Sequence, residues 1–251
     1  MSLRVDRVGP AVVLTVDRLA THNSIDLETA AAIGEAVRAA GEDRTARGVV
    51  LTGAGDRTFL SGGDLRMLAR ALDEGASPEL VLGMFEPLSA CERGELPVIA
   101  AVQGDAFGGG CELLLLCDLI VVESHARLSF RHAKMGLVPA WGGLTRLVER
   151  AGPGTAARLL YTADPIDAAE AARVGLADEV VPKGWAKARA IELVDRIAES
   201  PRGTVGALKK ALYAVREERR GASRDREREA FEERWGGPDH RAAIGAFLAK
   251  K

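Results

Sequence analysis

The sequence predicts an α/β fold in which parallel strands alternate with helices and a helical region follows at the C-terminus. Two observations lead to this prediction. Before Gly152, short apolar runs rich in β-branched residues alternate with helical segments, which is typical of parallel strands joined by right-handed crossovers. From about Gly152 onward, the periodicity is almost entirely helical.

Four runs predict the buried strands of this fold. The first is the β-rich stretch Ala11 to Val16, and continuous apolar runs follow at residues 48–52, 97–102 and 118–122. Such continuous runs are expected where both faces of a parallel sheet are covered. A shorter strand-like stretch, Glu179 to Pro182, lies between two later helices.

Helical segments separate and follow these strands. Asp26 is a suitable N-cap for the first helix, because its carboxylate can accept a bond from an unpaired N–H group. Residues 216–234 hold seven arginines against seven acids, which favours a solvated helix face over an arm that binds nucleic acid. Helices are expected at residues 27–40, 64–72, 79–92, 110–116, 144–150, 155–161, 167–173, 185–199 and 202–233.

The composition is that of a globular protein with a substantial core. Of 251 residues, 47% are apolar and 28% charged, and the net charge of −2 gives no reason to expect nucleic acid or acidic lipid as a partner. We expect no secretory leader and no membrane span, because every apolar run is too short. Three cysteines without a C-x-x-C pair indicate reduced thiols in a cytoplasmic protein. The four histidines lack zinc-site spacing, so no metal is expected.

Three loops contain the candidate functional residues. The first, FLSGGDL at residues 59–65, has two glycines that let the backbone approach a ligand closely, and Asp64 can cap the next helix. The second, GDAFGGGCE at residues 104–112, opens a helix directly after a predicted strand. The third, residues 130–143, leads from a polar stretch with His132 to a Gly-Gly turn. Taken alone, the first loop also fits an ordinary strand–loop–helix turn.

The helix start in the second loop suits a negatively charged ligand. Its unpaired N–H groups and the positive end of the helix dipole favour a phosphate or a developing oxyanion. Neither G-x-x-x-x-G-K-[ST] nor G-x-G-x-x-G occurs there, which disfavours a nucleotide-phosphate loop. Glu112 could serve the helix dipole alone, and His132 could be a structural histidine, so both roles stay open on these observations.

Taken in order, the three loops resemble a known family. F-x-x-G-G-D-L is followed by P-V-I-A-A-V-x-G-x-x-x-G-G-G-C-E-L, then C-D, then M-G-L-V-P-x-x-G-G-x-T-R-L. This order resembles the enoyl-CoA hydratase/isomerase (crotonase) superfamily. The resemblance implies a crotonase-like spiral of ββα units over residues 1–190 and a helical oligomerisation region over residues 191–251. It also implies a coenzyme A thioester substrate, with no permanently bound cofactor.

The resemblance also assigns roles to individual residues. The two N–H groups that stabilise a thioester oxyanion match Gly63 and Gly109, and the catalytic side chains match Glu112 and His132. The CoA moiety is expected along His22 and the loop from Gly63 through Asp64 and Leu65 to Arg66. A homotrimer or a dimer of trimers is implied, with apolar side chains in the C-terminal helices available for burial: Leu208, Leu212, Phe231 and Trp235.

The chain departs from the hydratase pattern at one position. Hydratases of the family use two glutamates; the first matches Glu112, but the second position, four residues before Gly136, holds His132. Together with Trp141 in the third loop, this histidine makes the chain most similar to the ethylmalonyl-CoA decarboxylase branch. We therefore expect a lyase that decarboxylates a 2-alkylmalonyl-CoA, such as ethylmalonyl- or methylmalonyl-CoA, through an enolate held in the oxyanion hole.

Two alternatives remain beside the decarboxylase. The first is an enoyl-CoA hydratase or isomerase of fatty-acid-type metabolism, in which Glu112 and His132 do acid–base work together, since histidine titrates near neutrality. The second is a non-catalytic member that binds CoA or RNA. The presence of Gly63, Gly109 and Glu112 weighs against the second alternative, as does the balanced charge, because RNA binding usually needs a basic surface.

Overall fold

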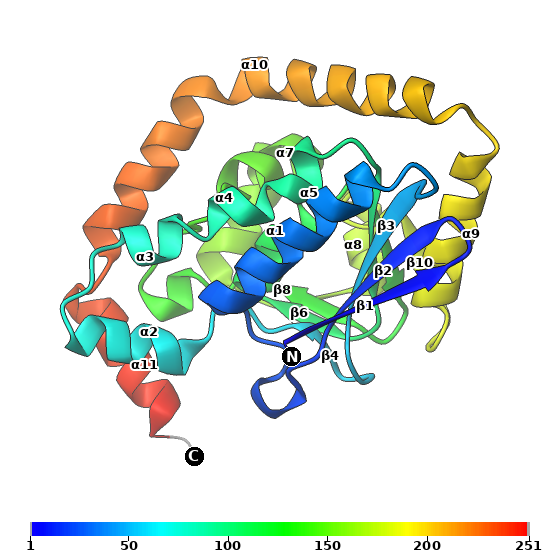
Figure 1. Ribbon diagram of the computed structural model, residues 1–251. Coiled ribbons are helices and arrows are strands. Elements are labelled where there is room, and N and C mark those ends of the chain that lie inside the picture. The colour runs from blue at the N-terminus through cyan, green and yellow to red at the C-terminus, as the bar shows by residue number, and fades with distance from the viewer. Residues whose placement is uncertain (1, 250–251) are drawn as a thin grey trace.

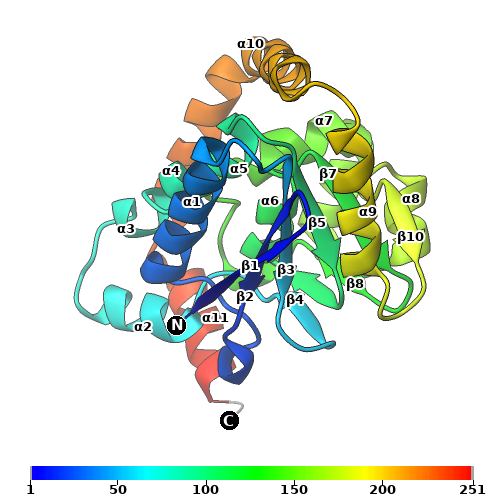
Figure 2. The same ribbon diagram turned by 45° about the vertical axis from the view of Figure 1, so that its right-hand side comes forward.

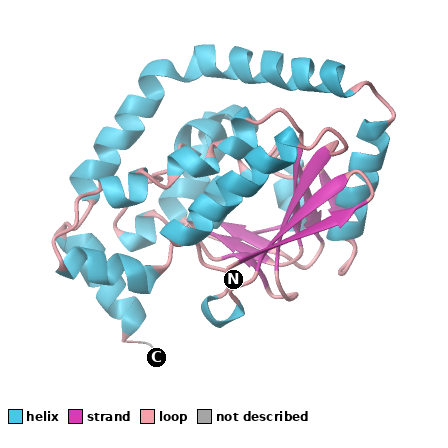
Figure 3. Cartoon of the chain, viewed as in Figure 1, coloured by secondary structure: helices cyan, strands magenta, loops and turns pink. Residues whose placement is uncertain are grey.

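Two mixed sheets form the strand-containing part of the molecule (Figures 1 and 3). The structure is a computed structural model that describes residues 2–249, apart from the side chains of residues 219, 221 and 222. The six-stranded sheet has the order β1 (Leu3–Val8), β2 (Ala11–Val16), β3 (Gly48–Gly53), β5 (Val98–Val102), β7 (Leu119–Glu123), β10 (Glu179–Val181). The four-stranded sheet has the order β4 (Thr58–Leu60), β6 (Asp105–Phe107), β8 (Arg127–Ser129), β9 (Ile166–Asp167).

Neighbouring strands are parallel in both sheets except at one edge of each. β1 pairs antiparallel with β2, and β8 pairs antiparallel with β9. All four predicted buried strands lie side by side in the six-stranded sheet, as β2, β3, β5 and β7. The predicted α/β class is therefore confirmed.

Helices cover both faces of the six-stranded sheet and continue beyond it. α9 packs on one face, as Figure 2 shows, and α1 on the other. The helices are α1 (Leu27–Glu42), α2 (Leu65–Asp73), α3 (Glu79–Leu82), α4 (Phe85–Leu88), α5 (Ala90–Arg93), α6 (Gly109–Leu114), α7 (Gly143–Thr162), α8 (Ala168–Arg173), α9 (Ala186–Ala198), α10 (Arg202–Arg234) and α11 (Pro238–Leu248). Two short 3₁₀ turns, η1 (Leu19–Thr21) and η2 (Ala133–Met135), lie in loops.

Alternate residues of the strands enter two apolar layers. Val13, Val50 and Ile99 pack with α9, whereas Leu14 and Leu51 face the larger core on the side of α1. Burial on both faces explains why these strands appear as uninterrupted apolar runs. The three cysteines are free and buried, and burial raises the pKa of the Cys91 and Cys111 thiols to about 12.

The prediction of one helix over residues 79–92 is wrong. Three short helices, α3, α4 and α5, occupy this stretch. Gly83 lowers the helix propensity, and Pro87 has no N–H group to continue the bonding pattern. Conversely, the helices expected at residues 144–150 and 155–161 are the two parts of α7, which is kinked at Gly152, where φ is +77°.

The C-terminal helices are packed against the body of the chain. Figure 1 shows α10 arching over the molecule from α9 to α11. Lys209 of α10 is buried and donates to Asp118 at 2.8 Å, and Arg220 donates at 2.6 Å to both Glu92 and Glu149. The expectation of a fully solvated charged face is therefore wrong at Arg220, and the division at residue 190 stays a prediction. In the described part of the chain, we find no helix long and apolar enough to cross a membrane.

Candidate active site

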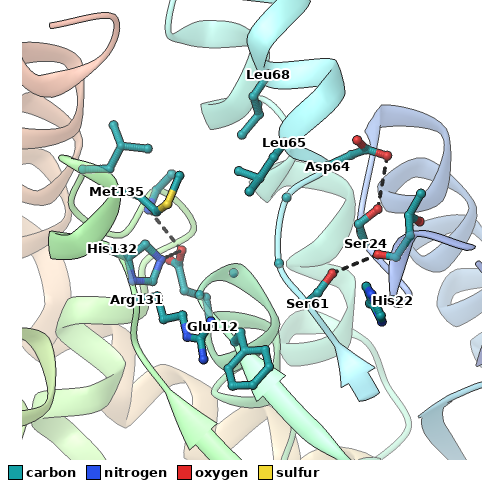
Figure 4. A pocket seen from close by; sticks show the side chains of 18 of the residues that line it. His22, Ser24, Ser61, Asp64, Leu65, Leu68, Glu112, Arg131, His132 and Met135 are labelled. Atoms are coloured by element: carbon teal, nitrogen blue, oxygen red, sulfur yellow. Dashed lines mark hydrogen bonds and ion pairs between the residues drawn. The ribbon is translucent and has the colours of Figure 1, made fainter. Parts of the chain in front are cut away.

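A cavity of about 630 Å³ brings the three predicted loops together (Figure 4). In Figure 4, Glu112, Arg131, His132 and Met135 lie on one side, and the Ser61-to-Leu65 loop with His22 lies on the other. Every residue that the sequence placed in the site lines this cavity: His22, Gly63, Asp64, Leu65, Arg66, Gly109, Glu112 and His132.

The Gly63 loop is held by a short backbone bridge to Ile25. The N–H of Ile25 donates to the carbonyl of Gly62 at 2.8 Å, and the N–H of Asp64 donates to the carbonyl of Ile25 at 2.9 Å. Gly62 has φ +100°, a backbone conformation that favours glycine. Within residues 2–249, the N–H of Gly63 between these two bonds has no acceptor. It is therefore available to a ligand.

Gly109 begins α6 beside this loop. A Cβ added to Gly62 would lie 3.1 Å from the backbone nitrogen of Gly109, so the two loops are adjacent. As the first residue of the helix, Gly109 has no partner for its N–H in the described part of the chain. Trp141 packs on the same residue, because a Cβ at Gly109 would lie 2.5 Å from the indole Cζ3.

Arg18 joins the two helices that flank the Gly63 loop. Its guanidinium lies 2.7 Å from Asp26, the cap of α1, and 2.9 Å from Asp64, the cap of α2. Burial raises the pKa of Asp64, but hydrogen bonds from the Met67 N–H, Arg18 and Ser24 outweigh burial and hold it below its usual value. Both caps were expected from the sequence, but Arg18 was not.

Glu112 is buried and bonded on all sides. Its Oε2 accepts the N–H groups of Trp141 at 2.8 Å and Gly143 at 3.1 Å, and its Oε1 accepts the N–H of Ala140 at 3.3 Å. The Nε2 of His132 lies 2.9 Å from the same Oε1. Because both oxygens of Glu112 already act as acceptors, Nε2 of His132 is the donor in this bond.

This bond fixes the state of the second histidine nitrogen. When the His132 ring is neutral and Nε2 is protonated, Nδ1 carries the lone pair. Nδ1 is buried and has no partner among the described residues. The pair therefore consists of a histidine ring that is oriented by a buried carboxylate.

The cavity lining combines apolar side chains with arginines. Leu137 and Val138 are part of the apolar lining, and the buried Trp141 is fixed by a 3.0 Å bond from its Nε1 to the carbonyl of Val81. Arg57, Arg66 and Arg131 line the cavity and are exposed to solvent. Such a combination suits an apolar acyl group attached to a polyanionic carrier.

Glu227 of α10 reaches the start of α7 beside Glu112. Its carboxylate accepts the N–H of Leu144 at 2.9 Å and the N–H and hydroxyl of Thr145 at 3.2 and 3.0 Å. Burial and the nearby Glu112 raise the pKa of Glu227 to about 7. Sequence reasoning missed this residue, because in the sequence it is one acid among many in a charged helix.

The profile of the enoyl-CoA hydratase/isomerase family matches residues 9–251. The chain belongs to this family. A crotonyl-CoA hydratase of Syntrophomonas wolfei is 38% identical over 174 residues, which are 67% of this chain and 65% of that protein. A short-chain-enoyl-CoA hydratase of Clostridium acetobutylicum is 30% identical over 98% of this chain and 94% of its own length.

The fold is that of solved members of the enoyl-CoA hydratase/isomerase family. A carnitinyl-CoA hydratase from Mycobacterium avium superposes with a TM-score of 0.88 and 31% identity, covering 100% of this chain and 96% of the other. The expected crotonase-like α/β fold with a helical C-terminal region is therefore confirmed.

The expectation of a decarboxylase is wrong. The three relatives above are named as hydratases, and their names favour the hydratase alternative over decarboxylation. The expectation relied on the absence of a second glutamate. In the structure, His132 at that position is hydrogen-bonded to Glu112, so the two side chains form a pair without that glutamate.

Membership of the family implies an acyl-CoA thioester substrate. Among residues 2–249, no group of three or more His, Cys, Asp and Glu side chains is placed to hold a metal ion.

Proposed function

We propose that the protein adds water to a short-chain 2-enoyl-CoA and catalyses the reverse dehydration of the 3-hydroxyacyl-CoA. The observation that carries this proposal is the Glu112–His132 pair, which lies in the same cavity as the two unpartnered N–H groups of Gly63 and Gly109. Relatives named crotonyl-CoA hydratase and short-chain-enoyl-CoA hydratase support the substrate class.

Gly63 and Gly109 bind the thioester in this mechanism. Their N–H groups donate to the carbonyl oxygen and stabilise the negative charge that develops when the double bond is attacked. Each donor of this kind is worth roughly 3–4 kcal/mol in the transition state. The adjacency of the two loops supports the assignment, since both donors must reach one oxygen atom.

His132 moves the proton. Nδ1 takes a proton from water as the water oxygen bonds to C3 and the double-bond electrons pass to the thioester oxygen. The resulting imidazolium then gives that proton to C2 as the carbonyl re-forms, so one hydrogen and one hydroxyl have been added. Glu112 stabilises the imidazolium through its bond to Nε2.

The CoA moiety is proposed to lie along His22 and the Gly63-to-Arg66 loop, with Arg57 and Arg66 near its phosphates. We also propose a homotrimer or a dimer of trimers in the cytoplasm. Leu208 and Leu212 are 60% and 66% exposed on α10, together with Val215. Phe231, which the sequence offered for the same role, is already buried within the chain.

The purified protein should be assayed with crotonyl-CoA and, in the dehydration direction, with carnitinyl-CoA, the substrates that occur in the relatives' names, and with saturated butyryl-CoA as control. Mass spectrometry should find a product heavier by one water from crotonyl-CoA or lighter by one water from carnitinyl-CoA, and no product from butyryl-CoA. A product of unchanged mass with a shifted double bond would replace hydration by isomerisation. Tight CoA binding without conversion of any thioester would indicate the non-catalytic alternative.

A further inference from the structure

Two buried carboxylates share the N-terminus of α7. The N–H of Gly143 donates to Glu112, and the N–H groups of Leu144 and Thr145 donate to Glu227. The first N–H groups of a helix have no partner within the helix, so here side chains of α6 and α10 satisfy them. Both carboxylates also lie at the positive end of the helix dipole.

The chain does not cap this helix locally. The N-cap residue is Gly142, which has φ +75° and no side chain to accept a bond. A local serine or aspartate would satisfy the same donors without burying a carboxylate from a distant helix. Glu227 is 5% exposed, and burying a carboxylate is costly unless it is well bonded. Capping alone therefore does not explain why the Glu227 carboxylate is buried at this helix start.

The start of α7 is in tight contact with Glu112. A Cβ added to Gly143 would lie 2.5 Å from Cγ and 2.7 Å from Oε2 of Glu112. Two of the three backbone donors to Glu112 lie at this helix start: Gly143 is its first residue, and Trp141 lies two residues before it. A displacement of the helix start by a fraction of an ångström therefore changes the bonds of Glu112, and through them the orientation of His132.

We propose that Glu227 is a positioning residue for the Glu112–His132 pair. By binding Leu144 and Thr145, it fixes the helix start whose neighbouring N–H groups hold Glu112. Helix α10 then supports the Glu112–His132 pair from outside the cavity loops. The kinetic test of this proposal rests on the proposed hydration, whereas the positioning of Glu112 is argued from the hydrogen bonds alone.

Glu227 also changes the charge around the pair. Glu112 faces it from α6, with His132 beyond, while α7 presents the N–H groups and the Thr145 hydroxyl. Of the arginines near it on α10, Arg224 is paired with Glu217 and Arg228 with Glu79 and Glu232, whereas Arg226 is exposed to solvent. Above its raised pKa, Glu227 therefore places a negative charge beside the carboxylate of Glu112.

The test compares Glu227→Gln with Glu229→Gln. Glu229 is an exposed acid two residues away on the same helix, so it controls for loss of charge from α10. For Glu227→Gln, we expect kcat for enoyl-CoA hydration to fall at least ~10-fold, with KM unchanged within about twofold. The pH–rate profile should also lose the change near pH 7 that ionisation of Glu227 causes in the wild type. Glu229→Gln should match the wild type.

A merely structural cap gives a different result. If Glu227→Gln lowers the melting temperature but keeps the kcat and pH profile of Glu229→Gln, the proposal is overturned. Should Glu227→Gln fail to fold, Thr145→Val removes a single bond to Glu227 and should show the same changes, only smaller. A folded Thr145→Val with wild-type kcat and pH profile would then overturn the proposal.

A second measurement separates this proposal from the proposed function. The imidazole signals of His132, assigned by comparison with His132→Gln, can be titrated by NMR in wild type and Glu227→Gln without any substrate. If the His132 titration differs between wild type and Glu227→Gln, but the protein hydrates no enoyl-CoA, the positioning role stands and the proposed hydration is rejected. An unchanged titration would overturn the positioning role, whatever the activity.

Discussion

Replacing Glu112 by glutamine should invert the hydrogen bond to His132. An amide offers one acceptor oxygen where the carboxylate offers two. The shortest backbone bond, at 2.8 Å, and the bond at 3.1 Å come from Trp141 and Gly143 to the same oxygen, so the amide oxygen takes that place. The amide NH₂ then faces Nε2 of His132, which becomes an acceptor, and the ring proton moves to Nδ1.

The effect on activity should exceed the effect on stability. Only the N–H of Ala140, whose bond is 3.3 Å long, loses its acceptor, which costs about 1–3 kcal/mol at most. With Nδ1 protonated, His132 cannot take a proton from water. Loss of a general base, or of its correct tautomer, lowers rates by about 10²–10⁴.

Steady-state kinetics with crotonyl-CoA and thermal unfolding should be measured together for Glu112→Gln and wild type. We expect a melting temperature within about ten degrees of wild type, as about 1–3 kcal/mol implies for a chain of this size, and a kcat near the detection limit. The reasoning would be refuted by a folded Glu112→Gln enzyme that keeps more than about a tenth of the wild-type kcat.

Three further predictions follow from the packing. Gly109→Ala puts a Cβ 2.5 Å from the Trp141 ring. This substitution should lower the free energy of unfolding in urea by about 1–3 kcal/mol and reduce activity. An unchanged free energy and activity would show that Trp141 can move freely. Because the pKa of Glu227 is raised to about 7, the folded state holds this proton more tightly than the unfolded state. The free energy of unfolding should therefore fall between about pH 4.5 and 7, by up to about 3 kcal/mol, and this slope should be absent in Glu227→Gln. If Leu208 and Leu212 are buried between subunits, changing both to Asp should yield a monomer in light scattering; an unaltered assembly would exclude that surface.

The central strands could be predicted because each is a continuous apolar run. Residues 48–52 and 118–122 belong to strands covered on both faces, and such burial favours the apolar, β-branched residues found in both runs. The second sheet could not be predicted in the same way. β6 (Asp105–Phe107) has three residues inside a glycine-rich loop, and β9 (Ile166–Asp167) has two, so neither contains a detectable repeat.

The site was predicted as a set of loops, but its internal bonds were not. Glu112 and His132 are twenty positions apart, and the sequence does not show that Nε2 and Oε1 meet at 2.9 Å. Without that contact, His132 looks like the loss of a second catalytic carboxylate, and the sequence therefore pointed to decarboxylation. Glu227 was missed for a related reason: its partners Leu144 and Thr145 lie more than eighty positions away, and only the folded chain brings them together.

The position of Glu227 near the end of the chain has a consequence for biosynthesis. The strands, the Gly63 loop, the Gly109 loop and His132 all leave the ribosome before α10 is made. On the proposed role of Glu227, such a nascent chain has an unanchored Glu112–His132 pair, and it also lacks Phe231 and Phe247 of the cavity lining. Catalysis should therefore begin only after α10 has docked.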